Sequence, residues 1–391
     1  MPSSRRRFLT GRMAADAARE AGERLADAIE ATQRRPLPQS GETVRLETQA
    51  MACPWAVILN PGPPERVLTA SQALDEVHRV EALLTVYRAD SPVSKLNREA
   101  ASGPCAVTPE LFELLDQCDT LRAATAGAFD PASQALIALW QRARSENRLP
   151  EQPEIDLALA ASGLRYVRRE NRQTEGGETC GVAFDVAGLG LNFGAIGKGY
   201  AIDRAATVLR DGGIDDFLVH GGHSSLLAAG EHYGQGGWPV GLKNPLFTEE
   251  SYLTLLLSDQ ALGTSGSNIQ YFRHQGRRYG HLLDPRNGWP AEEFLSVSVV
   301  APSATEADAL STAFYVLGLE NSLKYCDTHK SVGAILTPPA ERGRKLHPVV
   351  CNLPADRIFL TTDDVALQFW SFVEAGPKPP GSDTISSEAP P

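Results

Sequence analysis

The chain has 391 residues, of which 42% are apolar, and a formal net charge of −11 at pH 7. This length is enough for one large domain or two ordinary ones. The acidic balance argues against a general nucleic-acid or anionic-membrane surface, because both partners attract clustered positive charge. The six cysteines are scattered without a C-x-x-C pair, so neither a zinc site nor a disulfide framework is expected.

The two ends of the chain differ in composition from its centre. Residues 1–42 predict a charged helical extension and a linker, and residues 376–391 predict a disordered tail. Residues 4–10 read SRRRFLT, which resembles the twin-arginine export signal. The apolar segment that should follow is missing, so a cytoplasmic location is favoured, with export to the periplasm as the alternative. No run of 18 apolar residues predicts a transmembrane segment.

The centre of the chain carries strand and helix patterns without regular alternation. Residues 44–60 predict two short strands around a turn, and residues 69–86 predict a helix. Residues 108–126 predict another, because Thr108 and the proline after it form a typical helix start. Further strand-like runs are residues 182–186, 217–220, 238–242, 252–257, 295–301, 332–337 and 357–361. The pattern predicts an α+β fold, with residues 43–375 as a single large domain of antiparallel or mixed sheet flanked by helices.

A glycine-rich turn, FGAIGKGYAID at residues 193–203, resembles a phosphate-binding loop. It is not the nucleotide-triphosphate loop, because Asn192 replaces the first glycine of that motif and Gly199 replaces its hydroxyl. A helix is predicted to begin at residue 194, so its free N–H groups and Lys198 can attract an anion. The alternative is a tight turn with a solvated Lys198. The predicted apolar face of the helix consists of Ile202, Ala205 and Leu209.

A second motif, PSATEADALSTAFYVLG at residues 302–318, predicts a helix that begins with a capping box of Ser303 and Glu306. Its apolar stripe is Ala307, Leu310, Phe314 and Leu317. Asp308 and Thr312 form an i, i+4 pair that lies beside this stripe. Such a pair is usually a solvated face. The alternative is a magnesium site, because a carboxylate and a hydroxyl are hard oxygen ligands.

A third region combines hydroxyl groups with a histidine. Thr264 and Ser265 lie in LGTSGSNIQYF, and His281 comes three residues before an Asp-Pro turn at Asp284. One interpretation is a packed histidine at the end of a strand. The other is a site in which His281 takes up a proton, since its ordinary pKa is close to neutral.

These motifs together resemble the FAD:protein FMN transferase family, also called ApbE, over roughly residues 45–340. The resemblance is carried by MACPWA, LTVYRADSPVSKLN, TAGAFDPASQALIALW, NFGAIGKGYAIDRAATVLRDGGI, FLVHGGHSSLLAAG, LGTSGSNIQYF, YGHLLDPRNGWP and SVSVVAPSATEADALSTAFYVLG, in the order of the family. It implies a magnesium-dependent enzyme that cleaves FAD, attaches FMN through its phosphate to a threonine or serine of an acceptor flavoprotein, and releases AMP.

The resemblance also implies roles for individual residues. The FAD pocket would be lined by Met51, Tyr87, Ala128, Phe129, Asp130, Asn192, Lys198 and Leu282. The magnesium ion would be held by the Ala195 carbonyl and by Asp308, Ser311 and Thr312. The catalytic residues would be His281, Asp284 and Lys198, with His281 accepting the proton of the acceptor hydroxyl.

Five positions depart from the family pattern: Cys53, Ala132, Asn192, His223 and Asn287. The family usually has aspartate at two of them, Asn192 and His223, and loss of two acids near a metal and phosphate site could weaken metal binding. Two alternatives to the transferase therefore remain open. One is an FAD pyrophosphatase that uses water as the acceptor, and the other is a non-catalytic FAD-binding relative.

Overall fold

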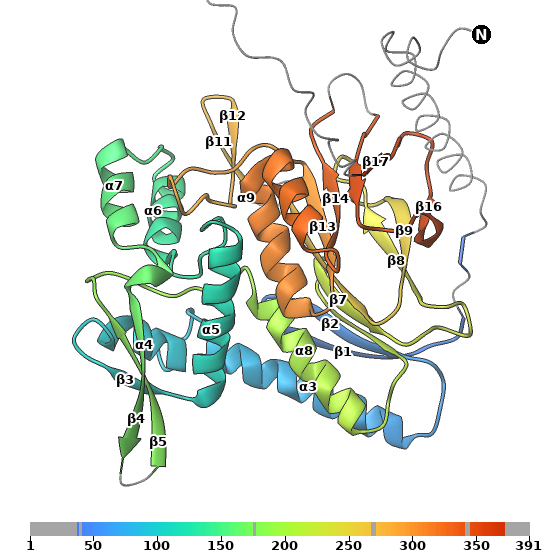
Figure 1. Ribbon diagram of the computed structural model, residues 1–391, viewed down its shortest axis with the longest axis horizontal. Coiled ribbons are helices and arrows are strands. Elements are labelled where there is room, and N and C mark those ends of the chain that lie inside the picture. The colour runs from blue at the N-terminus through green and yellow to red at the C-terminus, as the bar shows by residue number, and fades with distance from the viewer. Residues whose placement is uncertain (1–36, 39–40, 175–176, 267–270, 341–344, 372–391) are drawn as a thin grey trace, which may run out of the picture.

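A computed structural model describes residues 37–38, 41–174, 177–266, 271–340 and 345–371 (Figure 1). The predicted tail, almost all of the predicted helical extension and the twin-arginine-like residues lie outside these ranges. Within the described ranges, every helix is too short or too polar to cross a membrane.

A nine-stranded sheet forms the centre of the structure. Its neighbouring strands are antiparallel except for the last two, which are parallel, so the sheet is mixed as the sequence predicts. The strands, in spatial order, are β1 (Val44–Ala50), β2 (Cys53–Leu59), β6 (Phe217–Gly221), β7 (Ser225–Ala229), β10 (Gln260–Gly266), β13 (Ser296–Ala301), β14 (Gly333–Thr337), β15 (Val349–Cys351) and β17 (Gln368–Trp370).

Both faces of this sheet are covered by other elements. Successive side chains of a strand point to opposite faces, so the sheet presents apolar side chains on both faces. In β6, Phe217 and Val219 pack toward the helices, whereas Leu218 packs against a second sheet. The helices on the first face are α3 (Glu65–Leu84), α8 (Gly197–Asp211) and α9 (Ala304–Thr328) (Figure 1). The sheet on the second face consists of β8 (Trp238–Lys243), β9 (Ser251–Leu257) and β16 (Ile358–Leu360), which follows the short helix η2 (Ala355–Arg357).

A second group of elements lies beside the helical layer, at the left of Figure 1. Its helices are α4 (Pro92–Glu99), α5 (Pro109–Ala124), α6 (Gln134–Ser145), α7 (Gln152–Ala160) and η1 (Leu164–Tyr166). Its strands are β3 (Cys105–Val107), β4 (Val167–Thr174) and β5 (Gly177–Phe184), and a separate hairpin consists of β11 (Tyr271–His274) and β12 (Arg277–Gly280). Helix α5 begins as predicted, with the Thr108 hydroxyl accepting a hydrogen bond from the Leu111 amide.

The elements predicted within the described residues are present, with two differences in the helices. Helix α8 begins at Gly197 and not at residue 194, because the Phe193 carbonyl first accepts the amides of Ile196 and Gly197 in a tight turn. Helix α9 does not stop at Gly318. This glycine, with φ 79°, introduces a kink, and the helix continues to Thr328.

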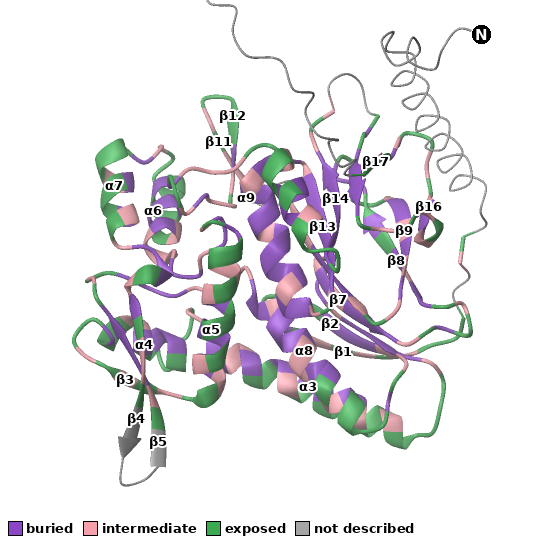
Figure 2. Cartoon of the chain, viewed as in Figure 1, coloured by how far each residue is buried: buried purple, intermediate pink, exposed green. Residues whose placement is uncertain are grey.

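The environment of α9 also differs from the sequence expectation. The apolar stripe predicts that Asp308 lies on a partly solvated side, but Asp308 is only 4% exposed. The helix is buried on most sides because α8 and β10 pack closely against it (Figure 2). A Cβ atom built on Gly199 of α8 would lie 2.0 Å from the Ala304 carbonyl oxygen, and one built on Gly263 of β10 would lie 2.2 Å from that of Ala307.

Candidate active site

The loop before α8 is organised by the side chain of Asn192. Its Oδ1 accepts a hydrogen bond of 2.9 Å from the Gly194 amide, and its Nδ2 donates one of 2.8 Å to Gln134. The Asn192 amide also donates to the Pro131 carbonyl at 2.7 Å. The loop is thereby tied to the segment that contains Ala128, Phe129 and Asp130, two parts of the predicted FAD pocket that are far apart in the sequence. An aspartate at position 192 would reverse the bond to Gln134, because an ionised carboxylate only accepts and the Gln134 amide would have to donate.

The start of α8 is tied to α9 through Asp308. The Gly199 amide donates to Asp308 Oδ2 at 3.0 Å, and the Ser225 hydroxyl donates to Oδ1 at 2.8 Å. The Lys198 ammonium lies 3.6 Å from Oδ1. A carboxylate buried this deeply needs such partners, because removing a charge from water is costly. The structure therefore brings together Lys198 and Asp308, which the sequence places in two separate motifs.

One consequence of this arrangement concerns the Ala195 carbonyl. In a regular helix the amide four residues later would donate to it, but the Gly199 amide is used by Asp308 instead. Among the hydrogen bonds of the described residues, none uses the Ala195 carbonyl. This oxygen, next to the first turn of α8, is therefore available to a ligand.

Hydroxyl groups line the adjacent part of α9. Ser265, in β10, lies 2.9 Å from the hydroxyl of Ser311 and 3.1 Å from that of Thr312. The Ser311 hydroxyl donates to the Asp308 carbonyl at 2.9 Å. The sequence interpretation missed Ser225, although it lies in the motif FLVHGGHSSLLAAG. The register of β7 beside β10, which places Ser225 opposite Gly263, is what brings it to Asp308.

The donor set fits a magnesium ion better than a softer metal. It contains one carboxylate, a backbone carbonyl and hydroxyl groups, which are the hard oxygen ligands that Mg²⁺ accepts while it keeps several waters. The described part of the chain contains no cluster of three or more His, Cys, Asp or Glu side chains that could hold a metal ion. A magnesium ion at Asp308 would consequently need further oxygens from water or a bound phosphate.

Met51 lies in a strained turn between β1 and β2. Both residues of this turn have positive φ angles, 48° at Met51 and 58° at Ala52, although neither is glycine. The Glu81 carboxylate of α3 accepts a hydrogen bond of 2.6 Å from the Met51 amide. Backbone strain of this kind persists where the surroundings fix it, often at functional sites. Glu81 is a residue that the sequence interpretation missed, because its role depends on the packing of α3.

Cys53, which follows the same turn, lies near the Lys198–Asp308 pair. Burial raises the pKa of its thiol, and the nearby Lys198 ammonium opposes that increase. A Cβ atom built on Gly222 would lie 3.3 Å from the Cys53 sulfur. His223, the next residue, is exposed. Cys53 and His223, two of the five positions that depart from the family pattern, therefore lie close together near the Lys198–Asp308 pair.

The other predicted pocket residues have different environments. Tyr87, just beyond α3, is 86% exposed, whereas Ala128 and Phe129 are buried. The Asp130 carboxylate accepts hydrogen bonds from the amides of Ala132 at 2.9 Å and Leu164 at 3.0 Å. Burial raises the pKa of Asp130, and these amides oppose that increase. The contacts of Asp130 join the backbone at residues 130–132 to the backbone at Leu164.

His281 and Asp284 follow the β11–β12 hairpin. His281 is exposed directly after β12, and the Leu282 carbonyl accepts the Ala291 amide at 2.9 Å. The buried Asp284 carboxylate accepts hydrogen bonds of 2.8 Å from Nε and Nη2 of Arg286 and one of 3.2 Å from Asn287. This pairing raises the pKa of Arg286. Asp284 therefore organises the turn after His281, and its predicted catalytic role stays a prediction.

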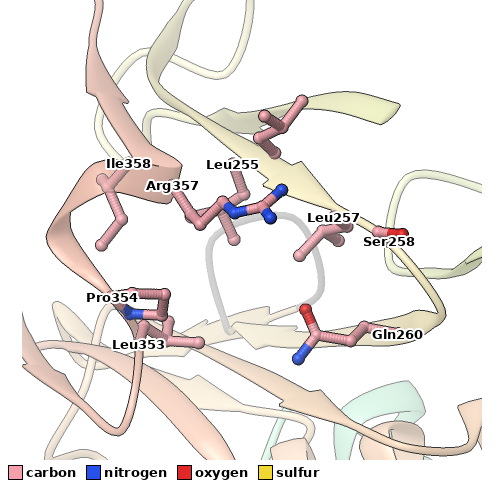
Figure 3. A pocket seen from close by; sticks show the side chains of 9 residues that line it. Leu255, Leu257, Ser258, Gln260, Leu353, Pro354, Arg357 and Ile358 are labelled. Atoms are coloured by element: carbon pink, nitrogen blue, oxygen red, sulfur yellow. The ribbon is translucent and has the colours of Figure 1, made fainter. Parts of the chain in front are cut away.

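A cavity of about 300 Å³ lies in another part of the molecule (Figure 3). It is lined by residues of β9, by Gln260 at the start of β10, and by the segment before β16 that includes Pro354 and Arg357. None of the predicted site residues lines it.

Comparison with known proteins identifies the family of this chain. The model of the ApbE family matches residues 43–336. The chain is 32% identical over 286 residues to the FAD:protein FMN transferase of Treponema pallidum, covering 70% of this chain and 78% of that protein. It is 30% identical over 263 residues to the protein of the same name from Escherichia coli strain K12, covering 66% and 72%.

Solved structures also agree. The crystal structure of the ApbE protein from Thermotoga maritima matches with a TM-score of 0.67 and 26% identity, over 75% of this chain and 94% of that one. The flavinyl transferase ApbE from Pseudomonas stutzeri, in its apo form, matches with a TM-score of 0.66 and 25% identity, over 81% and 96%. The predicted fold class and the resemblance are confirmed, and the chain belongs to the ApbE family.

Proposed function

We propose that this chain is a magnesium-dependent FAD:protein FMN transferase, which attaches FMN through a phosphoester bond to a threonine or serine of an acceptor flavoprotein and releases AMP. The main support is the Lys198–Asp308 pair at the start of α8, beside the Ala195 carbonyl and the hydroxyl groups of α9. Curated relatives at 30% identity or more carry the name FAD:protein FMN transferase.

In the proposed reaction, the acceptor oxygen forms a bond to the phosphorus of the FMN half of FAD. The bond from that phosphorus to the oxygen of the AMP half breaks, and AMP leaves with the electron pair. The ammonium of Lys198 supplies a fixed positive charge for the phosphate oxygens. His281 takes the proton of the acceptor hydroxyl as the general base.

Asp308 is the proposed anchor of the metal, with the Ala195 carbonyl, Ser311 and Thr312 as further oxygen donors. When bound, magnesium neutralises negative charge on the phosphate oxygens and the leaving group. Met51, Tyr87, Phe129 and the Asn192 loop are proposed to enclose the flavin and adenosine parts of FAD.

One experiment separates this function from the two alternatives. The protein is incubated with FAD, Mg²⁺ and a panel of purified flavoprotein domains, and both AMP and covalent flavin fluorescence on the acceptor are measured. A fluorescent acceptor with an equivalent amount of AMP supports the transferase. AMP without a labelled acceptor supports an FAD pyrophosphatase, and bound FAD without AMP supports a non-catalytic relative.

A further inference from the structure

The β11–β12 hairpin carries a positive surface that the proposed chemistry does not use. Residues 271–281 contain three arginines and two histidines and no acidic residue, in a chain whose net charge is −11. The hairpin projects next to α6 and α9 (Figure 1). A local positive surface on an acidic protein attracts negatively charged partners and raises their association rate.

The two faces of the hairpin have different roles. Phe272 and Tyr279 lie opposite each other in the register, with ring centroids 5.3 Å apart. They pack against Trp140 of α6, whose ring centroid lies 6.0 Å from that of Phe272 and 6.1 Å from that of Tyr279. The Trp140 indole also donates to the Gly288 carbonyl at 2.8 Å. This face attaches the hairpin to the body of the protein.

The opposite face carries Tyr271, Arg273 and Arg278, because side chains alternate along a strand and directly paired residues share a face. The Arg278 guanidinium lies 3.9 Å from the centre of the Tyr271 ring, and that of Arg273 lies 5.9 Å from it. Both arginines are exposed. Both guanidinium groups lie within cation–π range of the Tyr271 ring, and the register places the two arginines directly opposite each other.

These two guanidinium groups differ from the third one in the hairpin. Arg277 forms an ion pair of 2.7 Å with Glu292. Within the described ranges, no ion pair joins Arg273 or Arg278 to a carboxylate. Two neighbouring arginines without an acidic partner are suited to bind carboxylates of another molecule, since each can form a bidentate pair.

Both ends of the hairpin connect to the candidate active site. Before it, β10 carries Ser265, whose hydroxyl contacts Ser311 and Thr312. After it come His281 and Leu282, two predicted site residues. A partner bound on the outer face of the hairpin would therefore contact the segment that leads directly into His281.

We infer that the outer face of the β11–β12 hairpin, formed by Tyr271, Arg273 and Arg278, binds an acidic segment of the acceptor protein near the modified threonine or serine. This inference rests on the proposed transferase function. It assigns these residues to acceptor binding and separates them from FAD, which is held at Lys198 and the glycine turn.

The direct test is a binding measurement that needs no turnover. A fluorescein-labelled peptide with one threonine and several aspartates is compared with a matched peptide that has asparagines instead. We expect the native protein to prefer the aspartate peptide by about tenfold or more at low salt, and to lose this preference as salt screens the charges. Equal binding of both peptides by the native protein would overturn the inference.

The variants are Arg273→Glu with Arg278→Glu, and Arg210→Glu on α8 as a control with the same charge change per residue. The hairpin variant should lose the preference for aspartate, and the control should keep it. The difference in tryptophan fluorescence between each protein and its Trp140→Phe form shows whether the hairpin still packs on α6. If it does not, the milder Arg273→Gln with Arg278→Gln repeats the test. Unchanged preference in a packed hairpin variant contradicts the inference.

FAD binding and flavin transfer distinguish the inference from the proposed function. The hairpin variant should bind FAD with native affinity, but its KM for an acceptor domain should rise about tenfold at an almost unchanged kcat. A tenfold loss of FAD affinity would show that the arginines bind FAD phosphates and would overturn the inference. If the aspartate peptide binds through the hairpin but no acceptor is labelled, the result contradicts the proposed transferase function and leaves the inferred docking surface intact.

Discussion

The Gly199 amide donates a hydrogen bond of 3.0 Å to Asp308 Oδ2, across the contact between α8 and α9. This bond holds the carboxylate next to Lys198 and leaves the Ala195 carbonyl without its usual helical partner. It is possible only because the two helices approach closely, with no side chain at Gly199. The same contact thus determines the positions of the proposed anion-binding group and of two proposed metal ligands.

Substitution of Asp308 tests the metal site. Asp308→Asn removes the negative charge, so we expect FAD cleavage to be abolished at ordinary Mg²⁺ concentrations, with partial rescue by excess Mg²⁺ or Mn²⁺. Because Asp308 accepts hydrogen bonds from Gly199 and Ser225, the variant should also lose about 1–3 kcal/mol of stability. Thr312→Val should impair turnover less, since water can replace a neutral ligand. AMP release and calorimetry of FAD binding, each with and without Mg²⁺, measure the effects on the metal site. If Asp308→Asn keeps native magnesium-dependent turnover, the metal site lies elsewhere.

Lys198 is expected to contribute to FAD binding through its charge. Lys198→Ala should weaken FAD binding about 10–100-fold, because a hydrogen bond to a charged group contributes about 1.5–3 kcal/mol. Arg210→Ala removes the same charge near the other end of α8 and should have little effect. Fluorescence titration of both variants with FAD compares them, and equal affinities would contradict the role of Lys198.

His281 is expected to act on the acceptor hydroxyl and not on FAD binding. His281→Ala should reduce the rate of FMN transfer by about 10²–10⁴-fold, the usual contribution of a general base. Its affinity for FAD should stay within a few fold of the native value. Single-turnover transfer to an acceptor domain measures the rate, and FAD titration measures the affinity. If the variant transfers FMN at the native rate, His281 is not the base.

The close contact between α8 and α9 predicts different results for two glycines of α8. A Cβ at Gly199 would clash with the backbone of α9, whereas one at Gly197 would make only ordinary contacts, 3.5 Å from Leu84 and 3.7 Å from Phe193. Gly199→Ala should therefore destabilise the fold by about 3 kcal/mol or more, as other overpacked cores do. Gly197→Ala should be nearly neutral. Urea unfolding measures both, and similar stabilities would show that α9 can move away from α8.

Arg79 is expected to stabilise the protein in a pH-dependent way. It forms an ion pair of 2.7 Å with Glu76 within α3 and one of 2.6 Å with Glu110, which joins α3 to α5. Hydrogen bonds from Arg79 lower the pKa of both glutamates. A carboxylate with a lowered folded-state pKa adds stability above its unfolded-state pKa of about 4.3, and this stability is lost as the pH falls through the folded-state value.

Arg79→Met should therefore reduce the free energy of unfolding by about 0.5–2 kcal/mol at pH 7, since two partly exposed pairs are lost, and by less at pH 3. Arg88→Met is a suitable control, because the Arg88–Asp90 pair is exposed at 3.1 Å. Denaturant unfolding at the two pH values measures the difference. An Arg79→Met defect that is equal at both would exclude the ion pairs as its cause.

Local patterns along the chain were sufficient to predict several elements and the family of this protein. Thr108 caps α5 and Ser303 caps α9, because these caps depend on residues three positions apart. The apolar alternation of the strands likewise depends only on neighbours along the chain. Local patterns could not place the end of α9, since its kink at Gly318 lies inside a helix that packing continues to Thr328.

The assembly of the candidate site, in contrast, depends on how the elements pack together. The sequence suggested that Asp308 lies beside the apolar stripe, but the approach of α8 and β10 buries it and provides its partners Gly199 and Ser225. Glu81 reaches the Met51 amide through the packing of α3 against the first hairpin. Such contacts join residues that are tens of positions apart, and no local periodicity encodes them, because they depend on how closely whole elements pack.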